Sequence, residues 1–301
     1  MIPLFDLHCD TLGEMYDRNY SYDSSPLHIS LDKCVDFSPY IQVMAIWSDF
    51  RLSPKEAYKR YREALNYAKN QGINFLKDFE SESIARRGFI LAVEDAKIID
   101  GDLERLVKFK NDGVKIITLF WKDTNLLGGA WNTDIPLSDF GIEFTRKCFE
   151  LSIIPDVSHA SAKATKDIIK LAIDNDKTII ASHSNSYTVC HHKRNLADED
   201  FQAIKDLRGI VGISLASEHL RENGQAQIND ALKHIYHYLS LGGTDTVCLG
   251  CDFDGVSTLP HGIRNISDLK ELYFEMQYNF GSDITEKIFY KNAFDFFKRN
   301  Y

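Results

Sequence analysis

Apolar and polar positions along the chain form two kinds of segment that follow one another repeatedly. The first kind is a short run rich in Val, Ile, Leu and Phe with almost no polar position, which is typical of parallel strands buried on both faces. Eight such runs occur, at residues 4–8, 41–47, 89–93, 114–120, 153–157, 178–182, 209–214 and 246–251. They predict eight strands.

The second kind is an amphipathic segment with the period of a helix, and several of these begin at a capping Ser or Asp and end at Gly. Helices are predicted at 53–72, 101–113, 137–152, 161–176, 197–209 and 227–243, with two more near 267–280 and 284–298. Long polar loops are predicted at 17–36 and 121–137.

Strand–helix alternation of this length is typical of a (β/α)8 TIM barrel. We expect one such domain over residues 1–301, ending in C-terminal helices. A doubly wound open sheet is the alternative, but neither G-x-G-x-x-G nor the P-loop motif occurs in the chain.

Net charge and hydropathy argue against some classes of binding partner. The 35 basic and 44 acidic residues give a formal charge of −9, which argues against nucleic acid and anionic membranes as partners. No apolar run approaches the roughly 20 residues of a membrane span. The first residues carry no basic region of a signal peptide, so a cytoplasmic location is expected.

Cysteines and several histidines are interpreted as structural. The six cysteines are too few and scattered for a disulfide scaffold, and Cys248 and Cys251 are expected to be buried in a strand. His191 and His192 are expected to make polar loop contacts. The two remaining histidines of this group, His234 and His237, are expected on a helix flank.

Polar side chains end five of the predicted strands. On a strand, His8 and Asp10 would point to the same side because residues i and i+2 share a face. Any one of these residues alone could be a core histidine, a turn former or half of an ion pair. Together, at the barrel mouth where such strands end, they indicate a metal site. The set is His8, Asp10, Glu94, His159, His183, Asp252 and Asp254.

The number of donors favours two cations. A catalytic zinc uses three protein ligands plus water, whereas five N and O side chains suit two metals about 3.5–4 Å apart. Zn²⁺ is expected, and the same ligands also suit Mn²⁺ or Co²⁺.

The stretches "DLHCDT", "VEDA", "VSHAS", "ASHSNSYTVCHHKRNL" and "GCDFDG" resemble the membrane (renal-type) dipeptidase family, peptidase family M19 of the amidohydrolase superfamily, and especially its soluble bacterial members. The resemblance covers nearly the whole chain and implies that the TIM barrel is of the metal-dependent hydrolase type. It implies that His8, Asp10 and Glu94 bind one zinc. It also implies that Glu94, as the bridging ligand, binds the second zinc with His159 and His183.

The resemblance also implies substrate contacts. Arg194 corresponds to the arginine that holds the substrate carboxylate, and Asp252 corresponds to the acid beside the scissile amide, with Asp254 as the alternative. Where the family often has a histidine near the scissile carbonyl, this chain has Trp121, which can donate one N–H but cannot titrate.

The function that follows is a binuclear zinc dipeptidase. A metal-bridging hydroxide would attack the peptide carbonyl while Asp252 transfers the proton, with Glu94 and Asp252 as the catalytic carboxylates. The expected partner is a small dipeptide, and a homodimer is the assembly considered. The alternatives are another amidohydrolase, such as an N-acyl-amino-acid deacylase or a phosphotriesterase-like enzyme, or a non-catalytic metal-binding homologue.

Overall fold

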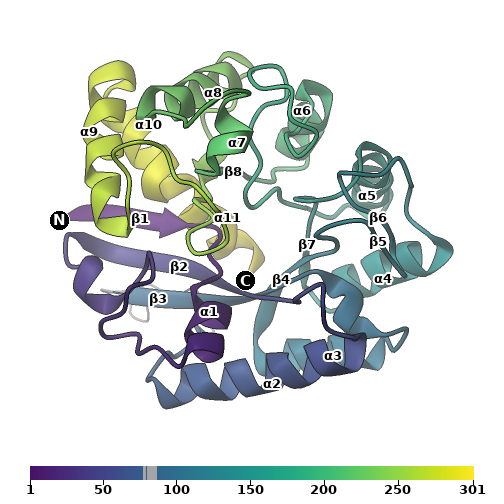
Figure 1. The fold of residues 1–301 in the computed structure, drawn as a ribbon. Coiled ribbons are helices and arrows are strands. Elements are labelled where there is room, and N and C mark those ends of the chain that lie inside the picture. The colour runs from purple at the N-terminus through teal and green to yellow at the C-terminus, as the bar shows by residue number, and fades with distance from the viewer. Residues whose placement is uncertain (77–78, 80–86) are drawn as a thin grey trace.

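The computed structural model describes residues 1–76, 79 and 87–301 of the chain. Seven strands form one curled parallel sheet in the order β7-β4-β3-β2-β1-β9-β8, surrounded by helices (Figure 1). The strands are β1 (Ile2–Asp6), β2 (Phe37–Trp47), β3 (Arg87–Glu94), β4 (Val114–Thr118), β7 (Ile154–Asp156), β8 (Val211–Ile213) and β9 (Val247–Leu249).

The segment 178–182 joins the two edges of this sheet. A regular strand was predicted here, but the segment instead makes two isolated parallel bridges. These pair Ile180 with Asp156 of β7 and Ala181 with Val211 of β8. The next backbone N–H, that of Ser182, donates to the Asp156 carboxylate at 2.9 Å and not to a neighbouring main chain, which cuts the ladder short. The bridges nevertheless bring all eight segments into a (β/α)8-type barrel, which confirms the predicted fold class.

The barrel interior is apolar and is covered by the C-terminal helix. Side chains from all eight strand segments contribute to it. Phe296 and Phe297 of α11 (Asn292–Asn300) pack against this interior cluster. Its strand members include Phe5, Ile41, Val43, Ile90, Ala92, Ile116, Ile154, Ile180, Ile210 and Cys248.

The outer layer consists mainly of the predicted helices. Ser53 and Glu56 form a capping box at the start of α2, as its sequence indicates. The helices are α1 (Thr11–Arg18), α2 (Pro54–Asn70), α3 (Glu104–Asp112), α4 (Asp139–Glu150), α5 (Ala162–Asp174), α6 (Asp198–Asp206), α7 (Ser217–Leu220), α8 (Ile228–Ser240), α9 (Leu269–Phe280), α10 (Ser282–Glu286) and α11. Short helical turns are η1 (Leu31–Lys33), η2 (Ala96–Ile99), η3 (Ile266–Asp268) and the π-helix η4 (Lys287–Lys291).

Some expectations are wrong in detail. Strand β1 ends at Asp6, two residues earlier than predicted, so His8 and Asp10 follow the strand instead of sharing its face. The loop 121–137 contains a small antiparallel pair, β5 (Thr124–Asn125) and β6 (Gly128–Gly129). The predicted last helix is divided between α10, η4 and α11.

The histidines and cysteines that were interpreted as structural can be compared with their observed contacts. His234 lies in the core and not on a flank: its Nδ1 accepts from the Ser186 N–H and its Nε2 donates to the Leu220 carbonyl. His191 contacts Glu222, as expected of a loop residue. All six cysteines are buried and free. None of the helices in the described part of the chain is long and apolar enough to cross a membrane.

Candidate metal centre

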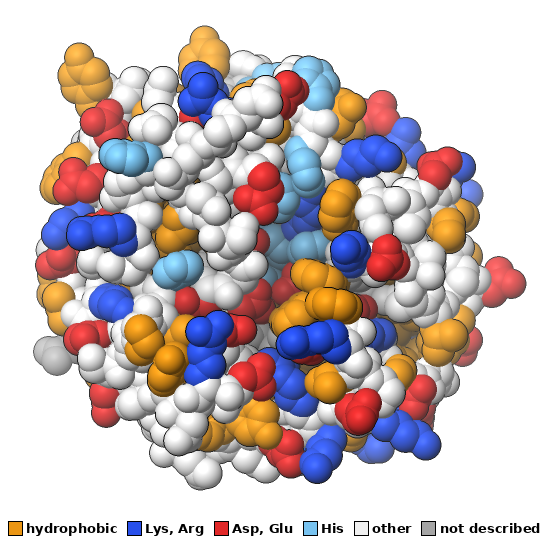
Figure 2. Space-filling view, viewed as in Figure 1, with side chains coloured by type: hydrophobic (Ala, Val, Ile, Leu, Met, Phe, Trp, Pro, Cys, Tyr) orange, Lys and Arg blue, Asp and Glu red, His pale blue; other side chains and the backbone are white. Residues whose placement is uncertain are grey.

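The predicted donors meet at the carboxyl end of the barrel. Glu94 is the last residue of β3, His8 follows β1, and His183 follows the 178–182 segment. His159 lies three residues beyond β7, and Asp10 precedes α1. Figure 2 shows histidine and acidic side chains gathered in a hollow near the centre of this face. The structure therefore brings together residues that are up to 175 positions apart in the chain.

Glu94 lies between two groups of donor atoms. Its Oε2 is 3.4 Å from His8 Nε2, and its Oε1 is 2.9 Å from His159 Nε2 and 3.6 Å from His183 Nε2. The groups His8–Asp10–Glu94 and Glu94–His159–His183 each fit a metal ion by distance, and Glu94 is their shared member.

Hydrogen bonds on the far side of two imidazoles fix their tautomers. His159 Nδ1 lies 2.9 Å from the Trp121 carbonyl, which can only accept, so this nitrogen carries the proton. Ser182 Oγ donates to the Asp156 carboxylate, and His183 Nδ1 lies 2.6 Å from the same hydroxyl, so it donates to it. Both Nε2 lone pairs consequently face the site, which is the usual support for a metal-binding histidine.

These lone pairs are crowded without a proton between them. The two Nε2 atoms of His159 and His183 are 3.0 Å apart, and both face Glu94 Oε1, another acceptor. Burial lowers the pKa of His159 to about 4 and that of His183 well below its usual value, so neither ring takes up a proton near neutral pH. Three acceptors that converge with no hydrogen among them fit a bound cation.

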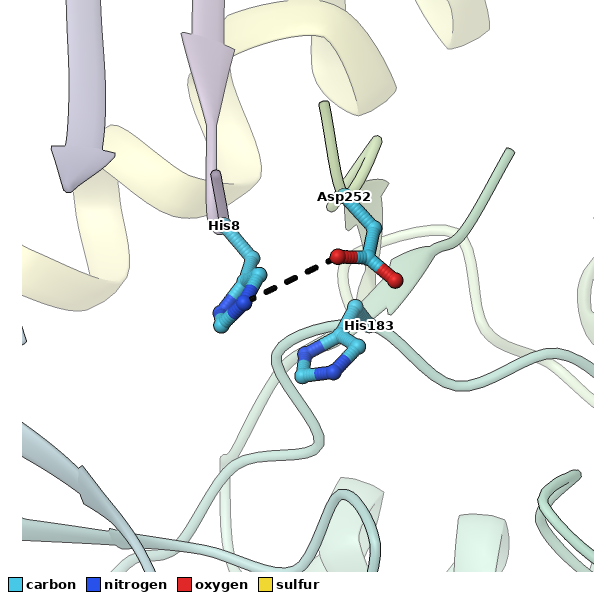
Figure 3. Close-up of side chains that lie close together, drawn as sticks. All are labelled: His8, His183 and Asp252. Atoms are coloured by element: carbon cyan, nitrogen blue, oxygen red, sulfur yellow. Dashed lines mark ion pairs between the residues drawn. The ribbon is translucent and has the colours of Figure 1, made fainter. Parts of the chain in front are cut away.

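The second group also fits a cation. His8 Nε2 and Asp10 Oδ1 are buried and have no hydrogen-bond partner among the described residues. The His8 Nε2 atom is 3.9 Å from Asp10 Oδ2 and 3.8 Å from Asp252 Oδ1. Figure 3 shows His8, His183 and Asp252 turned toward one another, with the His8–Asp252 pair as a dashed line. Buried polar atoms without a hydrogen-bond partner destabilise the fold unless a ligand binds them.

Three carboxylates lie close together in this small buried volume, and burial and neighbouring charges shift their pKa values. Burial, with the nearby Glu94 charge, raises the pKa of Asp10 to about 6. Burial also raises the pKa of Asp252 well above its usual value. For Glu94, burial acts in the same direction but is outweighed by the neighbouring imidazoles, His8 foremost, which hold its pKa low. Positive charge supplied at this position would relieve the repulsion.

Asp254, the alternative to Asp252, is occupied elsewhere. Its Oδ2 accepts from Thr11 Oγ1 and its Oδ1 from the His28 N–H, each at 2.6 Å. Asp252 instead lines the pocket over the donors that is described below. His159, Asp252 and Asp254 all have left-handed backbone conformations, with φ of 67°, 62° and 65°. Non-glycine residues rarely adopt them, and they concentrate at functional sites.

Gly255 holds the site open. A Cβ at this position would lie 2.2 Å from Asp10 Oδ2 and 2.3 Å from Asp252 Oδ1. We predict that Gly255→Ala pushes these carboxylates out of place and weakens metal binding by roughly 10- to 100-fold, the range seen for supporting residues of metal sites. A competition titration with a chromophoric chelator measures this. Unchanged affinity, with thermal unfolding like that of the parent, would contradict the prediction.

A pocket of about 160 Å³ lies over the donors. Arg194 lines this pocket and also lines a larger neighbouring cavity of about 580 Å³. The buried Arg194 guanidinium donates to Ser184 Oγ and to the His183 carbonyl, while its Nε has no partner among the described residues. Trp121 lines the pocket, and its ring stacks on the exposed Phe50 ring, with centroids 5.5 Å apart.

Sequence reasoning missed several residues of this site. Asp156 and Ser182 support His183, but nothing in their sequence context separates them from ordinary strand ends. Gly255 directly follows "DFD", which could have been taken as a signal for close backbone approach. His219, beyond the seventh predicted strand, also lines the pocket.

Comparisons with known proteins identify similar sequences and structures. The model of a family described as membrane dipeptidase (peptidase family M19) matches residues 1–299. An uncharacterized protein in the pqqA 5′ region of Klebsiella pneumoniae is 32% identical over 192 residues, 60% of this chain and 69% of that protein. An uncharacterized dipeptidase of Schizosaccharomyces pombe is 32% identical over 191 residues, 60% of this chain and 45% of that protein.

Among solved structures, a metallopeptidase of Rhodobacter sphaeroides, liganded with a phosphinate mimic of the dipeptide L-Ala-D-Ala, superposes with a TM-score of 0.89. The superposition covers 100% of this chain and 99% of that one at 22% identity, a likeness that shows the shared fold.

Proposed function

The chain belongs to the membrane dipeptidase family, peptidase family M19, and is therefore a metal-dependent hydrolase of dipeptides; from this premise we propose that it works with two zinc ions. Glu94 would bridge them, with His8 and Asp10 on one ion and His159 and His183 on the other. The observation that carries the proposal is the position of the Glu94 carboxylate, whose two oxygens face two separate groups of donors.

Divalent cations in this site would supply Lewis acidity toward the scissile carbonyl and make water nucleophilic near neutral pH. The chain's own residues manage the proton and the substrate. Asp252 lines the pocket beside His8, and a carboxylate there can accept the proton of the attacking water and return it to the leaving amine. Arg194 lines the same pocket, where its guanidinium can bind a substrate carboxylate.

The proposal is tested by metal analysis of the purified chain combined with a substrate panel. We expect about two zinc ions per chain, loss of hydrolysis on chelation, and recovery with Zn²⁺, Mn²⁺ or Co²⁺. The panel should include L-Ala-D-Ala, its all-L isomer and N-acetylated amino acids. Hydrolysis that survives chelation would refute the proposal, and turnover confined to the acylated amino acids would point to a deacylase.

Arg194→Lys tests the carboxylate contact. Burial lowers the Arg194 pKa to about 10, so the side chain stays charged near neutral pH, and lysine would keep that charge. The planar fork would be lost, however, and we expect kcat/KM for dipeptides to fall by roughly 10- to 100-fold, since a charge-assisted hydrogen bond contributes about 1.5–3 kcal/mol. Steady-state kinetics measure this. Equal kinetics for Lys and Arg would remove Arg194 from the substrate site.

A further inference from the structure

The larger cavity beside the metal pocket contains two buried acceptors without donors. Its volume of about 580 Å³ is within the roughly 300–1,000 Å³ of small-molecule sites. Asp200 of α6 lines it and is only 6% exposed, yet its carboxylate makes no hydrogen bond or ion pair to the described residues. Asn195 also lines it. The Asn195 nitrogen donates to the Cys190 and His219 carbonyls, so its buried oxygen is the atom that has no partner in the described chain.

The Asp200 carboxylate is available to a ligand because the nearby ammonium group is paired elsewhere. Lys166 Nζ lies 2.6 Å from Glu199 Oε1, and both of these side chains are exposed. Burial raises the pKa of Asp200 to about 6, so this carboxylate is charged above neutral pH. A buried charge without a partner destabilises the fold, and a cationic ligand would offset that cost.

The cavity is continuous with the metal pocket. The two spaces share three wall residues, Trp131, His159 and Arg194, so a ligand bound at Arg194 can extend from one space into the other. Val157 and Leu196 are buried and add an apolar wall, which suits the methylene stem of a long side chain. An arginine, an apolar wall and an unpaired carboxylate therefore line one space.

We propose that this cavity receives a basic side chain of the substrate's C-terminal residue. The inference rests on the proposed function, in which Arg194 binds the C-terminal carboxylate. The side chain of that residue then begins beside the wall that the two spaces share. Its terminal ammonium or guanidinium group would donate to the acceptors of Asp200 and Asn195. The substrate class is accordingly a dipeptide with lysine or arginine at the C-terminal position.

Dipeptides that differ only at the end of the C-terminal side chain test this inference. Alanyl-lysine, alanyl-norleucine and alanyl-glutamate, each with a D or an L second residue, are compared on the metal-loaded parent at pH 8. We expect kcat/KM for the lysine dipeptide to exceed that for norleucine by roughly 10-fold or more, as for a hydrogen bond between charged groups. Asp200→Asn should bring this ratio close to one, mainly through KM. Asp200→Lys should favour the glutamate dipeptide instead.

Glu199→Gln is the matched control. Glu199 is the preceding residue, is 66% exposed and pairs with Lys166, so its loss should leave the lysine-to-norleucine ratio at that of the parent. A ratio can still be measured on a variant that folds only in part. Calorimetric titration with free lysine and free norleucine gives a second readout that needs no hydrolysis. The parent should bind lysine more tightly than norleucine, and Asp200→Asn should not.

Two results would overturn this inference while the dipeptidase function stands. One is a parent that hydrolyses dipeptides without preferring lysine over norleucine. The other is an Asp200→Asn variant that keeps the parent's ratio. If the parent hydrolyses no dipeptide at all, the proposed function fails, and the inference fails with it.

Discussion

Replacing Glu94 with Gln is expected to remove at least one of the two proposed metal ions and to lower kcat/KM by about 10³-fold or more. The reason is geometric: each Glu94 oxygen faces a different donor group, so one substitution damages both sites. A neutral amide also offers one acceptor oxygen where two are needed, and the Lewis acidity that is lost contributes several kcal/mol to the transition state. Metal analysis after dialysis and steady-state kinetics measure the two effects.

Asp95→Asn is the matched control for this prediction. Asp95 is the next residue, and burial raises its pKa to about 6, but its carboxylate accepts from Asn125 and from the Lys97 N–H and belongs to neither donor group. The same acid-to-amide change there should leave the metal content at that of the parent. Full metal content in Glu94→Gln, or equal losses in the two variants, would exclude a bridging role for Glu94.

The gathering of the donors could be predicted from sequence because it depends on topology. Buried parallel strands read as continuous apolar runs, and polar residues that follow them meet at one mouth once the barrel closes. His8, Glu94, His159 and His183 each follow such a run, so their convergence did not require the exact strand ends. The strand that was assumed to orient His8 and Asp10 in fact ends at Asp6, and the pair still meets.

The sequence could not predict which groups hold the candidate metal ligands in place. The 178–182 segment loses its regular strand because the Asp156 side chain binds the Ser182 N–H, a contact that depends on tertiary register. Trp121 was expected to act through its indole, yet its carbonyl is what fixes His159, and any residue could offer a carbonyl. His219 escaped notice because it lies six residues past the end of β8, where only the α7 turn returns it to the pocket.

Asp252→Asn is expected to lower kcat by roughly 10²- to 10⁴-fold, the range for loss of a general acid–base group. Asparagine fills the same space and can still hydrogen-bond, but it cannot take up a proton. The KM should change little, because carboxylate binding is assigned to Arg194. Pre-steady-state and steady-state kinetics on a good dipeptide, with metal content measured in parallel, separate this role from simple loss of a ligand.

The metal content decides how the result is read, because Asp252 also forms a possible donor group with His8 and His183. Retained metals with a collapsed kcat support proton transfer, whereas metal lost in step with activity would make Asp252 a ligand. Asp254→Asn is the comparison: its carboxylate is held by Thr11 and the His28 N–H, so it should cost about 1–3 kcal/mol of stability and little kcat. A larger drop in kcat for Asp254→Asn than for Asp252→Asn would reverse the assignment, because the carboxylate that moves the proton must be the one free to face the substrate.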